Sequence, residues 1–327
     1  MSSADADALI DRAAELLDAG KLADALAELD RARAMFEGAG EQDSVAKCLH
    51  LSATVCRVSG DFAQAIDRAT RAEALAAPGT PAKVAAIAEQ GEVEILRGAH
   101  GVAADHYTRA LREGRKAGLL PDHAARLMRK RAAVLAAAQR FEEAASSARE
   151  GRALHQQTGA LAEARRATVE LAVVLEQAGD SVAVDAVIAE GLALAGESGD
   201  GHVAADLELL AAGRAVQRQD FAEALECARR ARQHALDATA VFSYVSSVLS
   251  IADIADALGD RDAAYEALAS GWVTTGDAIG EGPARQLFEP KLAALRDAWG
   301  SAAFTAVRDA YNDRRRAILR GDDSPGS

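Results

Sequence analysis

The sequence predicts an all-α fold in which seven helical hairpins follow one another and a divergent eighth hairpin comes last. Three observations lead to this prediction. Half of the 327 residues are hydrophobic but only 4% are aromatic, a composition typical of close-packed helices rather than of sheets. A turn signal recurs about every 40 residues, and three columns of small residues keep a fixed register to these turns.

The turn within each hairpin is marked by a glycine or a glutamine. These residues are 40, 38, 41, 40, 40 and 40 positions apart, at Gly20, Gly60, Gly98, Gln139, Gly179, Gln219 and Gly259. Glycine suits the left-handed residue that ends a helix. The aspartates that follow, Asp61, Asp180, Asp220 and Asp260, suit the N-cap of the next helix, and Asp61 with Gln64 and Asp220 with Glu223 approximate capping boxes. The first hairpin is therefore expected at residues 4–19 and 22–37.

The small residues predict where helices cross. The first column lies seven residues before each turn and contains Ala13, Ala53, Gly91, Ala132, Ala172, Ala212 and Ala252. The second lies five residues after each turn and contains Ala25, Ala65, Ala103, Ala144, Val184, Ala224 and Ala264. The third is seven residues further on and contains Ala32, Ala72, Ala110, Gly151, Gly191, Ala231 and Gly271. Helices that cross at about 8–10 Å leave little room for more than a methyl group, so these columns fit paired helices.

The C-terminal part of the chain is expected to form a capping hairpin. Its helices would cover residues 284–299 and 302–320, with Gly300 in the turn and Pro290 kinking or restarting the first helix. Two of the three small columns lapse here, as expected of a terminal unit with one face in water. We therefore divide the chain into a repeat array (1–282), a capping hairpin (283–320) and a disordered tail (321–327).

The turns and columns together resemble those of tetratricopeptide (TPR) repeats. The segments 60–66 and 220–225 are very similar to the Gly-Asp-aromatic turn of that family, and the resemblance covers residues 4–275. The units are longer than the usual length of about 34 residues, and Leu9, Leu49 and Met128 replace the large aromatics of the first helix. The resemblance implies a right-handed α–α superhelix, a TPR-like solenoid, whose first helices line a concave groove that holds a peptide segment or a partner helix.

The matching groove positions of this chain are basic in the N-terminal and central repeats. They carry the candidate partner-binding residues Lys47, His50, Arg57, Arg126, Arg129 and Arg166. The C-terminal repeats carry Glu176, Asp206, Asp253 and Asp256 instead. Arginine can bind a carboxylate through two parallel hydrogen bonds, so one hypothesis is that the basic part receives an acidic segment. The alternative is that these side chains are solvated or paired with local acids, and Glu92 already interrupts the basic part.

Other chemistry has little support in the sequence. The seven histidines are scattered over the repeat, and no phosphate-binding loop or nucleophile motif is present. We therefore expect no catalytic residues, cofactor or metal. The net charge of −13 argues against nucleic acid as a direct partner. The absence of a long apolar run and the acidic N-terminus argue against membrane insertion and secretion and predict a cytoplasmic protein.

Two functions remain open. The leading expectation is a non-enzymatic adaptor or scaffold that binds a peptide segment or partner helix in the groove. The alternative is a peptide- or ligand-sensing TPR regulator that acts through a partner protein. Direct DNA binding is not expected of it, because the first repeat begins within ten residues of the start and about 45 residues follow the seventh, which leaves little room for a helix-turn-helix module.

Overall fold

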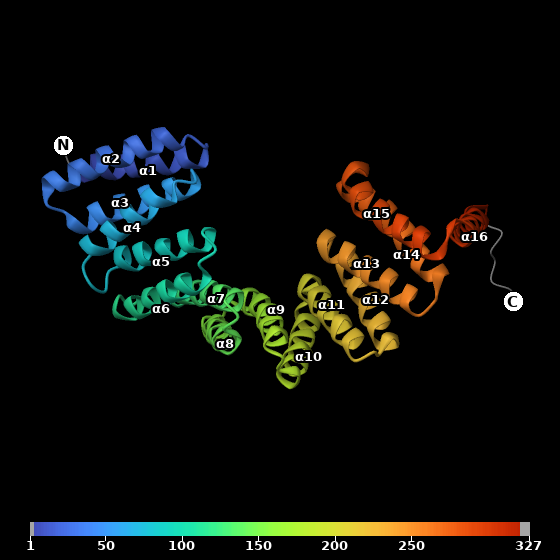
Figure 1. Cartoon of the computed structure of the whole chain (residues 1–327). Coiled ribbons are helices and arrows are strands. Elements are labelled where there is room, and N and C mark those ends of the chain that lie inside the picture. The colour runs from blue at the N-terminus through green and yellow to red at the C-terminus, as the bar shows by residue number, and fades with distance from the viewer. Residues whose placement is uncertain (1–2, 321–327) are drawn as a thin grey trace. The chain divides into compact units, whose positions relative to one another are not determined.

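The computed structural model describes residues 3–320, and all regular structure in that range is α-helical (Figure 1). The predicted disordered tail, 321–327, lies outside the described residues. The helices are α1 (Ser3–Asp18), α2 (Leu22–Ala39), α3 (Gln42–Val58), α4 (Phe62–Leu75), α5 (Pro81–Leu96), α6 (His100–Lys116), α7 (Pro121–Ala137), α8 (Phe141–Gln157), α9 (Leu161–Ala178), α10 (Ser181–Ser198), α11 (Gly201–Gln217), α12 (Phe221–Asp237), α13 (Val241–Ala257), α14 (Arg261–Ile279), α15 (Glu281–Trp299) and α16 (Ser301–Arg320). The all-α prediction is confirmed.

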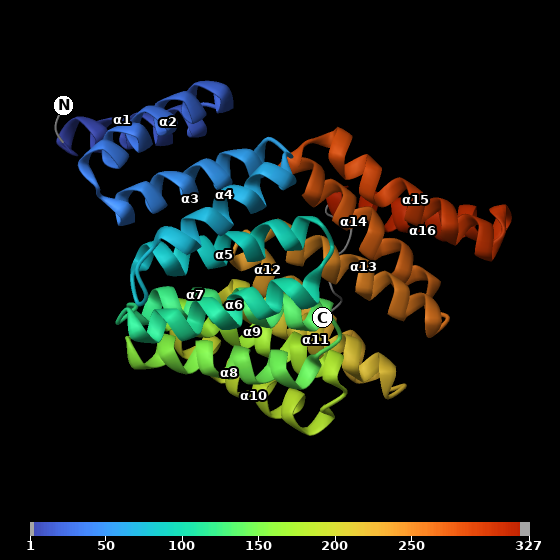
Figure 2. The same ribbon diagram turned by 60° about the vertical axis from the view of Figure 1, so that its left-hand side comes forward.

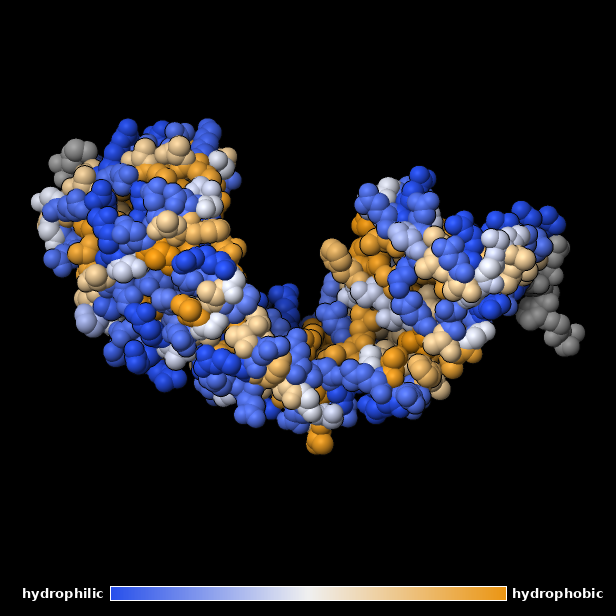
Figure 3. Space-filling model, in the orientation of Figure 1, coloured by the Kyte–Doolittle hydropathy of each residue, from blue (hydrophilic) through white to orange (hydrophobic). Residues whose placement is uncertain are grey.

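The chain forms two compact units, which span residues 1–181 (unit 1) and 182–327 (unit 2). In unit 1 the helices pack as antiparallel pairs, α1 with α2, α3 with α4, α5 with α6 and α7 with α8, and each pair packs against the next (Figures 1 and 2). Helices α11 to α16 of unit 2 pack in the same way on their neighbours in sequence. Polar residues cover much of the visible surface of both units, with apolar residues between them (Figure 3).

All seven predicted turn residues have the left-handed backbone conformation, with φ between 60° at Gln139 and 82° at Gly60. Gln139 and Gln219 adopt it without being glycine, at a cost of about 1–2 kcal/mol each. Their backbones are held by the same pattern of hydrogen bonds as the glycine turns. In the turn of Gln219, for example, the Gln219 N–H donates to Val216 O and the Asp220 N–H donates to Ala215 O, both at 2.9 Å. The turn is therefore imposed by the packing of the two helices and not only by glycine.

The predicted N-caps are confirmed where the structure describes them. The side chains of Asp61, Asp220 and Asp260 each accept a hydrogen bond, at 3.0 Å, from the backbone N–H three residues further on. The capping boxes form only in half, because the Asp61 N–H already donates to the Cys56 carbonyl that ends the previous helix. The side chain of Gln64 turns to the Asp61 carboxylate instead, at 2.7 Å.

Every residue of the three small columns is buried. At Gly271 even a methyl group would not fit, since a Cβ atom there would lie 2.5 Å from Cγ1 of Val248. At Gly91 it would lie 3.2 Å from Cζ of Tyr107. The columns therefore mark close helix contacts, as the sequence predicts.

The last two helices are α15 and α16, close to their predicted bounds. Pro290 lies inside α15, which does not restart there. No side chain described on α16 is buried. The helix is held by aromatic contacts, in which the rings of Tyr265 and Phe304 meet edge to face at 5.5 Å. Within residues 3–320 no helix has the length and apolar character needed to cross a bilayer.

Candidate functional site

All six predicted partner-binding residues lie in unit 1, on α3, α7 and α9. Lys47, Arg126, Arg129 and Arg166 are exposed, whereas His50 and Arg57 are half-buried. Arg129 and Arg166 line one pocket together. Arg126 is not among the residues that line it, and no acidic partner of Arg126 is found within residues 3–320. Lys47, His50 and Arg57 belong to α3, and the pocket is formed by α7, α8 and α9.

The cationic character predicted for α3 is largely cancelled. Arg57 Nε donates to Glu89 Oε1 of α5 at 2.6 Å, and the Glu89 side chain is only 6% exposed. Burial raises the pKa of Glu89, and the hydrogen bond from Arg57 opposes this shift. For His50, burial and the nearby charge of Arg57 lower the pKa to about 4. His50 is therefore neutral at physiological pH, and Arg57 is already paired.

Glu92 joins three helices in the next part of unit 1. It accepts a hydrogen bond from the Tyr107 hydroxyl at 2.6 Å and pairs with Lys130 of α7. Burial alone would raise the pKa of Glu92, but the hydrogen bonds from Lys130 and Tyr107 outweigh burial and lower it. The acid that interrupts the predicted basic row is thus a structural link between α5, α6 and α7.

An apolar groove lies between α7 and α9 in unit 1. Its volume is about 780 Å³. Its apolar lining is Ala132, Ala133, Ala136 and Ala137 of α7, Phe141 and Ala148 of α8, and Val169, Val173 and Val174 of α9. Polar side chains at its edges include Lys130, Gln139 and Gln177. Val173 is 41% exposed. The alanines of α7 leave this space open, because their side chains are too short to reach the valines opposite.

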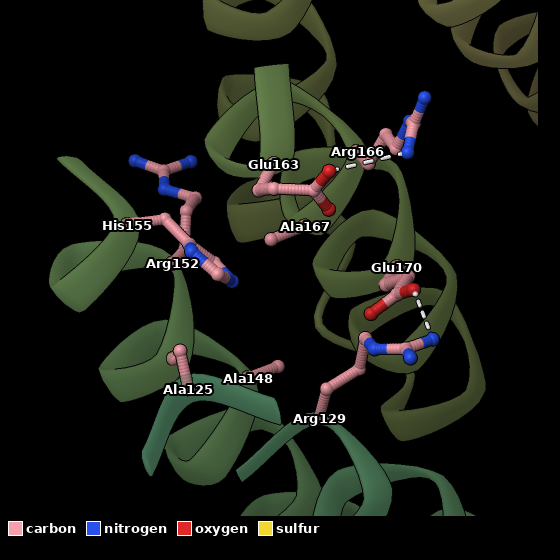
Figure 4. A pocket seen from close by; sticks show the side chains of 10 residues that line it. Ala125, Arg129, Ala148, Arg152, His155, Glu163, Arg166, Ala167 and Glu170 are labelled. Atoms are coloured by element: carbon pink, nitrogen blue, oxygen red, sulfur yellow. Dashed lines mark hydrogen bonds and ion pairs between the residues drawn. The ribbon is translucent and has the colours of Figure 1, made fainter. Parts of the chain in front are cut away.

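A smaller charged pocket adjoins the apolar groove, among α7, α8 and α9. Its volume is about 150 Å³. The ionisable residues that line it are Arg129, Arg152, His155, Glu163, Arg166 and Glu170 (Figure 4). Small residues, among them Gly151 and Ala167, form the rest of the wall and leave room between the longer side chains. Three arginines and two glutamates thus line the charged pocket.

Two ion pairs lie at the charged pocket, one between α7 and α9 and one within α9. Arg129 Nη1 lies 3.5 Å from Glu170 Oε1, and Arg166 Nη1 lies 3.2 Å from Glu163 Oε1 (Figure 4). Burial raises the pKa of Glu170, and the charge of Arg129 opposes the shift. Arg129 and Glu170 line both the charged pocket and the apolar groove. The two spaces therefore meet at this pair.

Known structures share this fold. The apo form of RapI aligns with a TM-score of 0.52 at 10% sequence identity, over 84% of this chain and 98% of its own. TPR-like repeats of a putative kinesin light chain from Podospora anserina align with a TM-score of 0.51 at 14% identity, over 60% of this chain and 98% of theirs. The chain is a TPR-like repeat array. Aspartyl phosphate phosphatase F from Bacillus subtilis is a further similar structure, with a TM-score of 0.50, 11% identity and coverage of 83% of this chain and 69% of its own.

At these identities the likeness concerns the fold of the TPR-like array. No protein-family model matches the sequence, and no curated protein matches it. Residues 3–320 contain no cluster of three or more His, Cys, Asp or Glu side chains arranged to hold a metal ion.

The sequence did not identify His155, Glu163 or Glu170 of the array as site residues. The resemblance directs attention to the first helix of each hairpin, but His155 lies on α8, the second helix of its hairpin. One signal could have found it. His155 follows Gly151 of the third small column by four residues, and residues four apart share a helix face. A histidine beside a small residue, on the helix face that meets the next hairpin, is a pattern that indicates a pocket between hairpins.

The acidic residues predicted for the C-terminal repeats of the array also have partners. Lys291 Nζ lies 2.9 Å from Asp253 Oδ2, and the Trp299 indole N–H donates to Asp256 Oδ1 at 2.6 Å. These carboxylates therefore hold α13 to the last hairpin of unit 2.

Proposed function

We propose that this TPR-like array is a protein-interaction scaffold that binds a segment of a partner protein in the apolar groove between α7 and α9. The observation that carries this proposal is an open groove with an apolar lining that ends in a pocket lined by arginines. Exposed apolar side chains gathered in one groove are typical of interaction sites. In this proposal the chain is not an enzyme, acts in the cytoplasm and has no direct nucleic-acid partner.

The size of the groove favours a segment of a chain over a small metabolite. The α7 residues that line the groove run from Arg129 to Ala137, over which the helix advances by about 12 Å. That length matches about four residues of an extended peptide or about two turns of a helix. The alanine and valine lining would take small or medium apolar side chains. The burial of each such side chain would contribute about 1.5–3 kcal/mol to binding before the entropy cost of ordering the segment.

The charges favour an acidic residue in the same segment. The side chains of Arg129 and Glu170 are 55% and 43% exposed, so their ion pair contributes little to the stability of the fold. A carboxylate of the partner can take the place of Glu170 beside Arg129 at small cost. The requirement is for one or two carboxylates near an apolar stretch, and not for a long acidic run.

A single pair of variants tests the groove. Val173→Asp places a charge on its floor and should abolish retention of a partner in a pull-down from source-cell lysate. Val102→Asp is the matched control, because Val102 of α6 is similarly exposed, at 49%, and is not among the groove residues. A partner retained by the wild-type chain and by Val102→Asp but lost from Val173→Asp supports the proposal. Equal retention by all three baits contradicts it.

A second comparison tests the acidic preference. Arg126, Arg129 and Arg166 are replaced together by alanine, and the retained partner is measured at low salt. If only the arginines that line the charged pocket matter, Arg126→Ala alone should bind like wild type, whereas Arg129→Ala with Arg166→Ala should bind weakly.

The alternative function, a sensor of a peptide or ligand, is favoured by the place of the groove in the chain. Helix α9 forms one wall of the groove and is the last helix wholly within unit 1. A ligand that moved α9 could therefore change how the two units are connected. Small-angle scattering with and without the partner segment separates the two functions: an altered radius of gyration favours the sensor, and an unaltered one favours the scaffold.

A further inference from the structure

His155 is a buried polar side chain that makes no hydrogen bond within residues 3–320. The residue is 8% exposed, and its Nδ1 atom is inaccessible and unpartnered. Buried polar groups are nearly always hydrogen-bonded, so this ring needs an explanation. His155 lines the charged pocket, where it stands with Arg152 on one side while Glu163 and Glu170 stand on the other (Figure 4).

The environment of the His155 ring determines which of its two nitrogens can contact a molecule in the pocket. A proton on the inaccessible Nδ1 would be a buried donor without an acceptor, which costs more than leaving a lone pair there. The neutral imidazole is therefore expected to carry its proton on Nε2. Because Nδ1 is inaccessible, Nε2 is the nitrogen that a molecule in the pocket can reach. His155 thus offers the pocket one N–H donor that the protein leaves unused.

The charged groups around His155 favour an anion. Helix α7 contributes Arg129, α8 contributes Arg152, and α9 contributes Glu163, Arg166 and Glu170. The side chains of Arg129 and Arg166 are 55% and 70% exposed, so solvent screens their ion pairs with Glu170 and Glu163. An anion that enters the pocket can therefore share these guanidinium groups.

The charged pocket is large enough for a carboxylate group, since its volume is about 150 Å³. This is enough for a carboxylate and the carbon atoms next to it, with the remainder of the ligand in the adjoining apolar groove.

We propose that the charged pocket binds a single carboxylate group, which accepts a hydrogen bond from Nε2–H of His155 and pairs with the guanidinium groups of Arg129 and Arg166. The carboxylate is either the C-terminus of a chain or the side chain of an Asp or Glu. This inference deepens the proposed function and rests on it for the biological ligand, because the carboxylate would belong to the segment in the apolar groove. The binding of a carboxylate can nevertheless be tested without that segment.

The test uses three small probes and the full-length chain. N-acetylglycine represents a C-terminal carboxylate, the N′-methylamide of N-acetylaspartate represents a side-chain carboxylate, and the N-methylamide of N-acetylglycine is the neutral control. Imidazole and amide NMR signals are followed during titration. We expect saturable shifts at His155 and at the amides around Gly151 and Ala167 with at least one carboxylate probe, and none with the neutral probe. The probe that binds more tightly shows whether the carboxylate of the ligand is a chain terminus or a side chain.

Substitutions of His155 test whether its imidazole ring contributes to carboxylate binding. His155→Leu removes the donor and should weaken binding by about threefold to tenfold. His155→Gln keeps an N–H donor in a similar position, so it should bind like wild type. His202→Leu is the matched control, because His202 is an exposed histidine of α11 in unit 2. Unchanged amide spectra away from the pocket show that each variant is folded.

Several outcomes overturn the proposal. Absence of any carboxylate-dependent shift at His155 would do so, as would equal binding by wild type and His155→Leu. Tighter binding of inorganic phosphate than of either carboxylate would show that the ligand class is wrong. The proposed function is tested separately. If neither carboxylate probe binds but Val173→Asp still loses a partner that Val102→Asp retains, the partner binds in the apolar groove and the charged pocket does not bind a carboxylate.

Discussion

Arg129 Nη1 lies 3.5 Å from Glu170 Oε1, and this pair stands where the apolar groove meets the charged pocket. The two residues are on α7 and α9, the first helices of consecutive hairpins. Both side chains remain substantially exposed, so solvent screens their attraction. The pair therefore holds the entrance of the pocket in place without closing it.

Exchanging the charges of Arg129 and Glu170 should weaken partner binding while leaving the stability of the fold nearly unchanged. Arg129→Glu combined with Glu170→Arg keeps an ion pair between α7 and α9, so the free energy of unfolding should change by less than about 1 kcal/mol. Binding of an acidic partner segment should fall by about tenfold or more, because a carboxylate now faces the pocket from α7. Urea denaturation measures the first quantity and titration with the partner segment the second. An exchanged variant that binds as tightly as wild type would show that the position of the arginine does not matter.

Gly271 should not tolerate a methyl group. Its added Cβ would lie 2.5 Å from Val248 Cγ1 and 3.2 Å from Phe288 Cε1, and both of those side chains are fully buried. Gly271→Ala should therefore lower the free energy of unfolding by about 1–3 kcal/mol, despite the higher helix propensity of alanine. Gly213 of α11, where nothing lies within 4 Å of the added Cβ, is the matched position in unit 2. Gly213→Ala should stabilise by about 0.5–1 kcal/mol. Thermal unfolding followed by circular dichroism checks both signs, and two destabilised variants would show that steric fit at Gly271 is not the cause.

Gln219 should gain stability on replacement by glycine. Its φ of 61° is in the left-handed region that side chains disfavour. Gln219→Gly should therefore raise the free energy of unfolding by up to about 1 kcal/mol, since relief of strain exceeds the entropy that glycine adds to the unfolded chain. Gln233→Gly, inside α12, should instead lower it by about 1 kcal/mol. If both variants are destabilised, the left-handed turn at Gln219 carries no strain.

His50 should make the fold sensitive to mild acid. Burial lowers its pKa from 6.5 to about 4, so between these values the unfolded chain binds a proton that the folded chain does not. Stability from this group is therefore fully present above about pH 6.5 and is lost as the pH falls toward 4, by up to about 3 kcal/mol. His50→Gln should lose less stability over this range than wild type. The exposed His202→Gln should lose as much as wild type. Urea midpoints at about pH 7 and about pH 4.5 provide the measurement, and identical pH profiles for wild type and His50→Gln would contradict the expectation.

The features that the sequence predicts well are local and repeated. A glycine or glutamine marks each turn, and an aspartate follows it in four of the seven. A small residue at a fixed distance from the turn marks each helix contact, so all seven turns and all three columns could be located from the sequence. The ionic contacts could not. Arg57 and Glu89 are 32 residues apart, and their pairing depends on how one hairpin is rotated against the next. The charged pocket depends on three helices at once, and His155 enters it from the helix that the family resemblance leaves outside the groove.

The buried columns also decide which mutational scans can be informative. Every column position is alanine or glycine except Val184, so replacement by alanine leaves most of them unchanged. A scan that truncates side chains would pass over the contacts that hold the hairpins together and would assign their stability to the larger residues nearby. Only a scan that adds atoms, residue by residue, can detect where the helices touch.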